Sequence, residues 1–168
     1  MTTYDALDGI GGPDRIDWVD LRLVPDLAEA PGRLGMTGLA GALRLRGGDV
    51  DTLLLLLEDR ELAVAVRGEG IRVMRHPIVD MGVPADRAVF GAALEAVRTE
   101  VRNGRSVVVA CHGGLGRTGT AVACLLVDAG LGRNEAIAFV RATRPGTIET
   151  KSQEAFVRGW GDGRDDGK

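Results

Sequence analysis

The stretch Cys111-His112-Gly113-Gly114-Leu115-Gly116-Arg117 decides the fold of this chain, because it joins two apolar segments of different kinds. Val107-Val108-Val109-Ala110 precedes it and is typical of a buried strand, whereas residues 118–128 are almost entirely apolar and typical of a buried helix. The three glycines allow backbone conformations that residues with a Cβ resist. The stretch therefore predicts a strand, a tight loop and a helix start, with a thiol at one end of the loop and a guanidinium at the other.

A loop at the start of a helix presents several backbone N–H groups together and is suited to an anion. Arg117 can hold two oxygens of one phosphate. Cys111 would act as its thiolate, which a helix N-terminus and nearby cations favour, and Thr118 can donate its hydroxyl to the sulfur. We therefore expect Cys111, Arg117 and Thr118 to be catalytic. The phosphate-binding residues are expected to be His112, Gly113, Gly114, Leu115, Gly116 and Arg117, with the His112 side chain pointing away.

Two other interpretations of this stretch fail. A nucleotide-binding P-loop counted from Gly114 would need lysine at position 120, where Thr120 stands. A zinc site would need better spacing than Cys111, His112, Cys124 and His76 offer. No metal site is therefore expected, and Cys124 is expected to pack in the core.

Short apolar runs and helical periodicities alternate along the rest of the chain. Strands are predicted at 16–24, 50–57, 71–75 and 106–110, a loop at 31–41, and helices at 39–46, 59–67, from Pro84 to 103, 118–128, from an Asn134 cap to 144, and 150–159. This pattern predicts an α/β fold with a short central, mostly parallel sheet flanked by helices. One domain is expected over residues 15–159, with flexible segments at 1–14 and 160–168.

Residues 107–118 resemble the signature His-Cys-x5-Arg-Ser/Thr of the cysteine-dependent protein tyrosine phosphatases. The tract from Cys111 to Arg117 is especially similar to that of the cyclin-dependent-kinase-associated phosphatases, in the compact dual-specificity-like group. The resemblance implies hydrolysis of phosphotyrosine, with phosphoserine and phosphothreonine left open, through a cysteinyl-phosphate and without a metal or organic cofactor. The chain departs from the pattern at Ala110, where the family has a histidine that helps set the environment of the nucleophile.

Cleavage of a phosphate ester needs an acid for the leaving oxygen and then a base for water. The loop 76–84 offers one carboxylate, Asp80, among apolar residues, and resembles the Asp-x-Gly-x-Pro stretch that carries the family's general acid. The resemblance implies that Asp80 is this acid. Alternatively, Asp80 caps the helix predicted from Pro84. Asp86 is expected in the first turn of that helix, interacting with its dipole, and His76 is expected to be structural.

Two further places have both a functional and a structural interpretation. Residues 147–153 resemble the family segment whose glutamine orients the hydrolytic water, which implies a catalytic role for Gln153. Thr150-x-x-Gln153 is also a capping box, and the two roles are compatible. Asp59 and Arg60 follow a central strand, where ligands gather in α/β folds; they either line the mouth of the pocket or begin a solvated helix.

The composition argues against two classes of binding partner. A net charge of −3 and an aromatic content of 4% argue against nucleic-acid binding. The longest leucine run, residues 53–57, is too short to cross a bilayer, so no membrane partner is expected. Two cysteines and no secretion signal favour the cytoplasm. A phosphoprotein substrate is expected, and a monomer is favoured.

Several alternative functions remain at this point. A phosphatase for a phosphoinositide or a small phosphate ester is one, although such pockets usually add basic residues to the loop, and none lies between Cys111 and Arg117. A non-catalytic phosphopeptide-binding module is a second, against which Cys111, Arg117 and Asp80 argue. A rhodanese-like sulfur transferase or an arsenate reductase can share Cys-x5-Arg, but neither accounts for the Asp80 loop.

Overall fold

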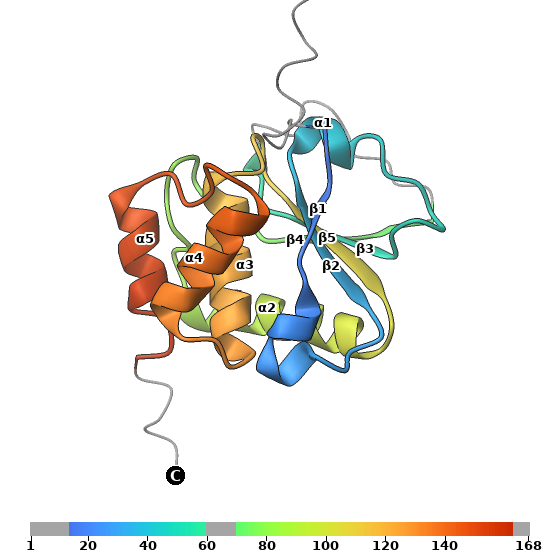
Figure 1. Cartoon of the computed structure of the whole chain (residues 1–168). Coiled ribbons are helices and arrows are strands. Elements are labelled where there is room, and N and C mark those ends of the chain that lie inside the picture. The colour runs from blue at the N-terminus through green and yellow to red at the C-terminus, as the bar shows by residue number, and fades with distance from the viewer. Residues whose placement is uncertain (1–13, 60–69, 163–168) are drawn as a thin grey trace, which may run out of the picture.

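The computed structural model of the protein describes residues 14–59 and 70–162. Figure 1 shows α3, α4 and α5 gathered together on one side of the sheet. The described elements are β1 Asp17–Trp18, the 3₁₀ helices η1 Leu21–Leu23 and η2 Pro25–Leu27, β2 Arg33–Thr37, α1 Leu39–Ala42, β3 Thr52–Leu55, β4 Arg72–Arg75, α2 Arg87–Arg102, β5 Ser106–Ala110, α3 Gly116–Asp128, α4 Arg133–Thr143 and α5 Lys151–Arg158.

The sheet has five strands in the order β1-β2-β5-β3-β4. β2, β5, β3 and β4 are parallel, and β1 is antiparallel to β2, so the predicted mostly parallel α/β fold is confirmed. Ala110 at the end of β5 pairs with Thr37 of β2 and with Leu55 of β3, which in turn pairs with Arg75 of β4. The segments that follow these four residues therefore leave the sheet at the same edge.

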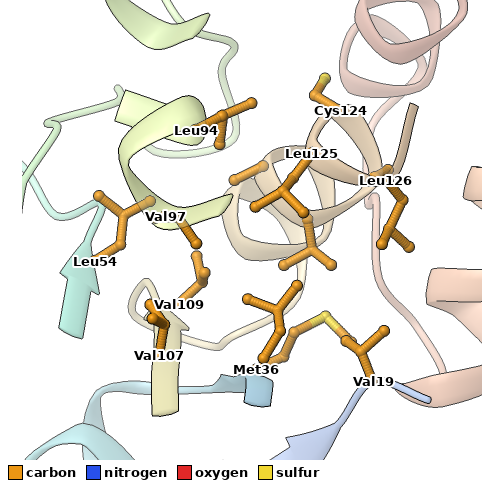
Figure 2. Packing of buried hydrophobic residues seen from close by; sticks show 14 of the residues in the cluster. Val19, Met36, Leu54, Leu94, Val97, Val107, Val109, Cys124, Leu125 and Leu126 are labelled. Atoms are coloured by element: carbon orange, nitrogen blue, oxygen red, sulfur yellow. The ribbon is translucent and has the colours of Figure 1, made fainter. Parts of the chain in front are cut away.

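The core lies between the sheet and the long helices α2 and α3. The valines of β5 are fully buried, as expected for a central parallel strand covered on both faces. In Figure 2, Val97 of α2 and Leu125 of α3 lie over Val109 and Met36 of the sheet. Cys124 belongs to the same buried cluster, as predicted.

The first third of the chain differs from the prediction. The predicted strand at 16–24 is only two residues long, because the Asp20 carboxylate accepts a hydrogen bond from the Arg22 amide and begins a 3₁₀ turn. The predicted loop at 31–41 contains the five-residue strand β2. Its Gly35 is not a turn residue; a Cβ there would lie 2.8 Å from Ile16 and 3.0 Å from Trp18, so close packing against β1 requires the glycine.

Two predicted helix starts are wrong. Pro84 does not open α2, because the Asp86 carboxylate accepts from the amides of Ala88 and Val89 and makes Asp86 the N-cap. Asn134 is not the cap of α4, which begins after Gly132, whose amide donates to Glu135. The start of α2 at residue 87 also removes the interpretation of Asp80 as its cap.

The buried part of the structure extends further toward the C-terminus than predicted. α5 runs from Lys151 to Arg158 as expected, but Trp160, placed in the predicted tail, is 1% exposed and stacks edge-on against Phe90. The helix predicted at 59–67 falls almost entirely outside the described residues. Within the described ranges, no helix is long and apolar enough to cross a membrane.

Candidate active site

The loop from Cys111 to Arg117, called the cysteine loop below, follows β5 at the upper end of the sheet in Figure 1. Every carbonyl from residue 112 to residue 116 accepts a hydrogen bond from a residue outside the loop. The donors are, in order, the Leu39 amide (2.9 Å), the Arg144 guanidinium to residues 113 (3.3 Å) and 114 (2.9 Å), the amides of Gly119 (2.9 Å) and Ile148 (3.2 Å) to residue 115, and the Thr120 hydroxyl (2.8 Å) to residue 116.

Because the loop carbonyls point toward these donors, the loop amides point away from them. In a planar peptide the carbonyl of one residue and the N–H of the next point in opposite directions, so the bound carbonyls of residues 112–115 direct the amides of residues 113–116. In the described part of the chain, the amides of residues 112–116 donate to no protein acceptor. The loop is therefore a nest of N–H groups at the N-terminus of α3, which is an anion-binding geometry.

Cys111 and Arg117 stand at the two ends of the nest, as predicted. Cys111 is 3% exposed and forms no disulfide. Arg117 is 2% exposed; its Nη1 donates to the carbonyl of Ile78 at 3.1 Å, and its Nη2 lies 3.1 Å from the Asp80 carboxylate. A buried thiol and a buried guanidinium thus lie at the two ends of the nest, where both would face a bound anion.

Thr118 is fully buried on the first turn of α3, but its hydroxyl has no hydrogen-bond partner among the described residues. The predicted hydrogen bond to the Cys111 sulfur is therefore not formed in this structure. The role of Thr118 toward a thiolate stays a prediction.

Asp80 lies in the segment 76–83, called the acid loop below, and its side chain is 55% exposed. Besides the Arg117 contact, its carboxylate accepts from the Met81 amide, and its own amide donates to Glu58. Met81 has a φ of 60°, unusual for a residue with a side chain. The structure thus brings the predicted acid to the predicted phosphate-binding arginine across 37 residues of sequence.

His76 begins the acid loop and has a structural environment, as expected. Its ring lies 5.2 Å from the ring of Phe90. Burial lowers the pKa of His76, and the negative charge of Asp86 opposes this shift more weakly. The imidazole is therefore neutral at pH 7.

Gln153 links the two loops. Its side-chain oxygen accepts from the amides of Glu149 (2.9 Å) and Thr150 (3.1 Å), and its nitrogen donates to the carbonyl of Gly82 in the acid loop (3.1 Å). A Cβ on Gly116 of the cysteine loop would lie 2.8 Å from the same nitrogen. The capping box with Thr150 is confirmed, whereas the predicted role of Gln153 in orienting water stays a prediction.

Two residues that the sequence did not single out complete the site. Arg144 and Asp17 form a buried ion pair behind the cysteine loop, with 2.8 Å between Nη1 and Oδ2. The sequence contained one signal for Arg144: Pro145 follows it and favours an extended conformation, and Arg144 indeed leaves α4 with φ −137° and ψ 98°. No sequence signal pointed to Asp17.

Beside the acid loop lies an open hollow of about 410 Å³ lined by Glu58, Asp59, Pro77 and Val79. Asp59, predicted at the pocket mouth or at a helix start, lines it and pairs with Arg75. Arg60 lies outside the described residues. Across the described ranges, no three His, Cys, Asp or Glu side chains are grouped closely enough to hold a metal ion.

The family is shown by comparison with known proteins. Residues 40–157 match the family model described as "Swiss Army Knife protein, DSP-PTPase phosphatase domain". The match covers more than half of the chain, which therefore belongs to this family of cysteine-dependent phosphatases. "Protein tyrosine phosphatase domain-containing protein 1" of Mus musculus is 42% identical over 80 residues, 47% of this chain but only 10% of its own length. "Protein tyrosine phosphatase type IVA 2" of Mus musculus is 32% identical over 104 residues, 61% of this chain and 62% of its own.

Solved structures share the fold. Kinase associated phosphatase, with its catalytic-site cysteine replaced by serine, superposes with a TM-score of 0.74 at 24% identity, covering 88% of this chain and 93% of that one. Tk-PTP in the active form has a TM-score of 0.64 at 28% identity, covering 82% and 96%. PTPMT1, in a complex with PI(5)P, has a TM-score of 0.66 at 21% identity, covering 76% and 88%.

The two central glycines of the cysteine loop should differ in their tolerance of a side chain. Gly114 has a φ of +69°, and a Cβ there would lie 2.4 Å from the Thr37 carbonyl carbon; Gly113 has open space. We expect Gly114→Ala to lower the free energy of unfolding by about 2–4 kcal/mol. Gly113→Ala should stay within about 0.5 kcal/mol of the wild type. Urea denaturation measures both, and equal stability of the two variants would contradict the loop geometry.

Proposed function

We propose that this chain is a protein phosphatase that hydrolyses phosphotyrosine, and also phosphoserine or phosphothreonine where the pocket admits them, through a cysteinyl-phosphate. The observation that carries the proposal is the set of carbonyls at residues 112–116 that accept from outside the loop. We infer from it that the loop amides turn toward one position between Cys111 and Arg117. A dianionic phosphoryl group matches that position, because its oxygens accept from the amides and from the guanidinium.

The first step transfers the phosphoryl group to the enzyme. The Cys111 thiolate attacks phosphorus in line, so that an S–P bond forms while the bond to the leaving oxygen breaks. Asp80 gives its proton to that oxygen, which prevents the release of a high-energy anion. The loop amides and Arg117 stabilise the equatorial oxygens throughout.

The second step frees the enzyme. The Asp80 carboxylate takes a proton from a water molecule, whose oxygen attacks phosphorus while the S–P bond breaks, giving inorganic phosphate and the Cys111 thiolate. In this proposal Gln153 holds the acid loop, through Gly82, beside the cysteine loop.

The contact between Asp80 and Arg117 indicates how substrate binding would free the acid. The carboxylate stands 3.1 Å from the guanidinium that the substrate phosphate would bind. Phosphate therefore competes with the Asp80 carboxylate for Arg117. The displaced carboxylate takes up a proton from solvent and can then act as the acid toward the leaving oxygen.

The acids around the site favour a phosphoprotein over a phosphoinositide. Glu58 accepts from the Asp80 amide, Asp59 lines the adjoining hollow, and a Cβ on Gly116 would lie 2.6 Å from the Glu149 carboxylate. Of these, the exposed Glu149 carboxylate beside the cysteine loop would repel additional phosphates on an inositol ring, whereas it would attract a basic residue beside a phosphorylated side chain. A phosphoinositide phosphatase remains the second candidate, since PTPMT1, solved with PI(5)P, shares the fold.

Replacement of the nucleophile should abolish turnover. We expect Cys111→Ser to hydrolyse p-nitrophenyl phosphate at less than about one thousandth of the wild-type rate, because the attacking thiolate is lost. Wild-type enzyme mixed rapidly with substrate should release a burst of one nitrophenolate per active site if dephosphorylation of the enzyme is slower than its phosphorylation. Cys124→Ser, in the core, is the control and should retain turnover. Activity of Cys111→Ser at the control's level would overturn the mechanism.

Loss of the acid should depend on the leaving group. We expect Asp80→Asn to lower kcat by about 100-fold with phenyl phosphate, and by less with p-nitrophenyl phosphate, whose leaving group needs less protonation. KM should change little. Asp86→Asn is the matched control, since asparagine also caps a helix and the Asp86 carboxylate is engaged with the Ala88 and Val89 amides. Equal losses for both substrates would exclude Asp80 as the proton donor.

The acidic side chains near the site should affect which phosphopeptides the enzyme prefers. We expect a phosphotyrosine peptide with flanking arginines to have a higher kcat/KM than the same peptide with flanking glutamates, and Glu149→Gln to reduce the ratio by about threefold. Phosphothreonine versions of the peptides and PI(5)P in mixed micelles complete the panel. A kcat/KM for PI(5)P above that of every peptide would favour the second candidate instead.

A further inference from the structure

The side chain of Arg144 joins the end of α4 to the cysteine loop and to the edge strand β1. Its Nε donates to the Gly114 carbonyl at 2.9 Å and its Nη2 to the Gly113 carbonyl at 3.3 Å. Its Nη1 donates to the Arg15 carbonyl at 3.2 Å and to the Asp17 carboxylate at 2.8 Å. The side chains of Arg144 and Asp17 are 1% and 3% exposed, so all of this takes place away from water.

The two loop contacts decide the direction of two amides. Each peptide unit is rigid, so holding the Gly113 carbonyl directs the N–H of Gly114, and holding the Gly114 carbonyl directs the N–H of Leu115. A cation on the carbonyl also polarises the peptide and makes its N–H a stronger donor to an anion. Backbone amides and Thr120 hold the other three carbonyls, so these two depend on a side chain brought from α4.

Asp17 stabilises the buried guanidinium of Arg144. A guanidinium buried without a counter-charge is strongly unfavourable, and the Asp17 carboxylate supplies the charge from β1, which is held in register by the pairing of Asp17 with Met36. The other oxygen of Asp17 lies 2.8 Å from Arg15 Nε. The carboxylate thus holds Arg144 in the one orientation that reaches both carbonyls.

We propose that Arg144, anchored by Asp17, is a positioning residue that sets the affinity of the cysteine loop for phosphate-like oxyanions. The proposal rests on the proposed function in that it takes phosphate to be the ligand of the loop. It goes beyond it by assigning a functional effect to a residue pair that would not touch the substrate. Lysine cannot replace Arg144, because one ammonium group cannot reach the two carbonyls and the carboxylate together.

The test is a double-mutant cycle on oxyanion affinity, measured by calorimetric titration of the full chain with sodium tungstate. We expect Arg144→Lys to raise the tungstate Kd by about tenfold or more, and Asp17→Asn by about threefold, because charged hydrogen bonds to the loop are lost or weakened. In the Arg144→Lys background, Asp17→Asn should change the Kd by less than about twofold. Circular dichroism and a urea titration establish that each variant is folded at the temperature of measurement.

Arg98→Lys is the matched control. Arg98 is also largely buried and donates to a helix-terminal carbonyl, that of Asp128, but it lies at the opposite end of α3 from the cysteine loop. It should lose stability with an unchanged tungstate Kd, which separates positioning from a general loss of packing. If Arg144→Lys does not fold, Asp17→Asn keeps the guanidinium and supplies the same comparison with Arg98→Lys.

Each outcome of the tungstate titrations supports or overturns a specific part of the proposal. Folded Arg144→Lys or Asp17→Asn with the wild-type Kd overturns the proposal, and additive effects of the two changes overturn the anchoring role of Asp17. Binding is measured without turnover, so a wild type that binds tungstate but hydrolyses no phosphate ester would contradict the proposed function alone. A wild type that binds no tungstate would contradict the anion site itself.

Discussion

The buried guanidinium of Arg144 donates to the cysteine loop, at the carbonyls of Gly113 and Gly114, and to the segment around β1, at the Arg15 carbonyl and the Asp17 carboxylate. A buried cation is stable only when its charge and its hydrogen bonds are satisfied together. Asp17 satisfies the charge, and the carbonyls of Arg15, Gly113 and Gly114 accept further hydrogen bonds from the guanidinium. The same requirement therefore holds the edge strand, the end of α4 and the cysteine loop in one arrangement.

The parallel register provides the frame around this interaction. Thr37, Ala110 and Leu55 end three neighbouring strands at the same level. The segments after β2, β5 and β4 consequently leave the sheet at one edge, where the cysteine loop accepts from the Leu39 amide of α1 and contacts the acid loop through Arg117. Strain is found in the flanking segments, since Met81 and Ile148 both have positive φ angles near 60°. Such conformations persist only where the surroundings fix them, and they are common beside functional sites.

The sequence was most informative where a local pattern has one structural meaning. A short β-branched run, a glycine-bearing loop and an apolar stretch could only be a buried strand, a tight turn and a buried helix, and β5 and α3 follow this prediction. Local patterns failed where the cause lay elsewhere in the fold. Gly35 seemed a loop glycine, yet β2 needs it because Ile16 and Trp18 pack against it, and Trp160 seemed part of a loose tail, yet Phe90 covers it.

The sequence by itself determined the chemistry of the site: a thiol, a nest of amides and a guanidinium lie within seven residues, so their proximity follows from chain connectivity alone. Only the tertiary structure decided how these groups are aimed. The contact of Asp80 with Arg117 spans 37 residues, and that of Asp17 with Arg144 spans 127. Contacts of this kind depend on strand order and on the burial of charge, which leave no periodicity in a single sequence from which they could be read.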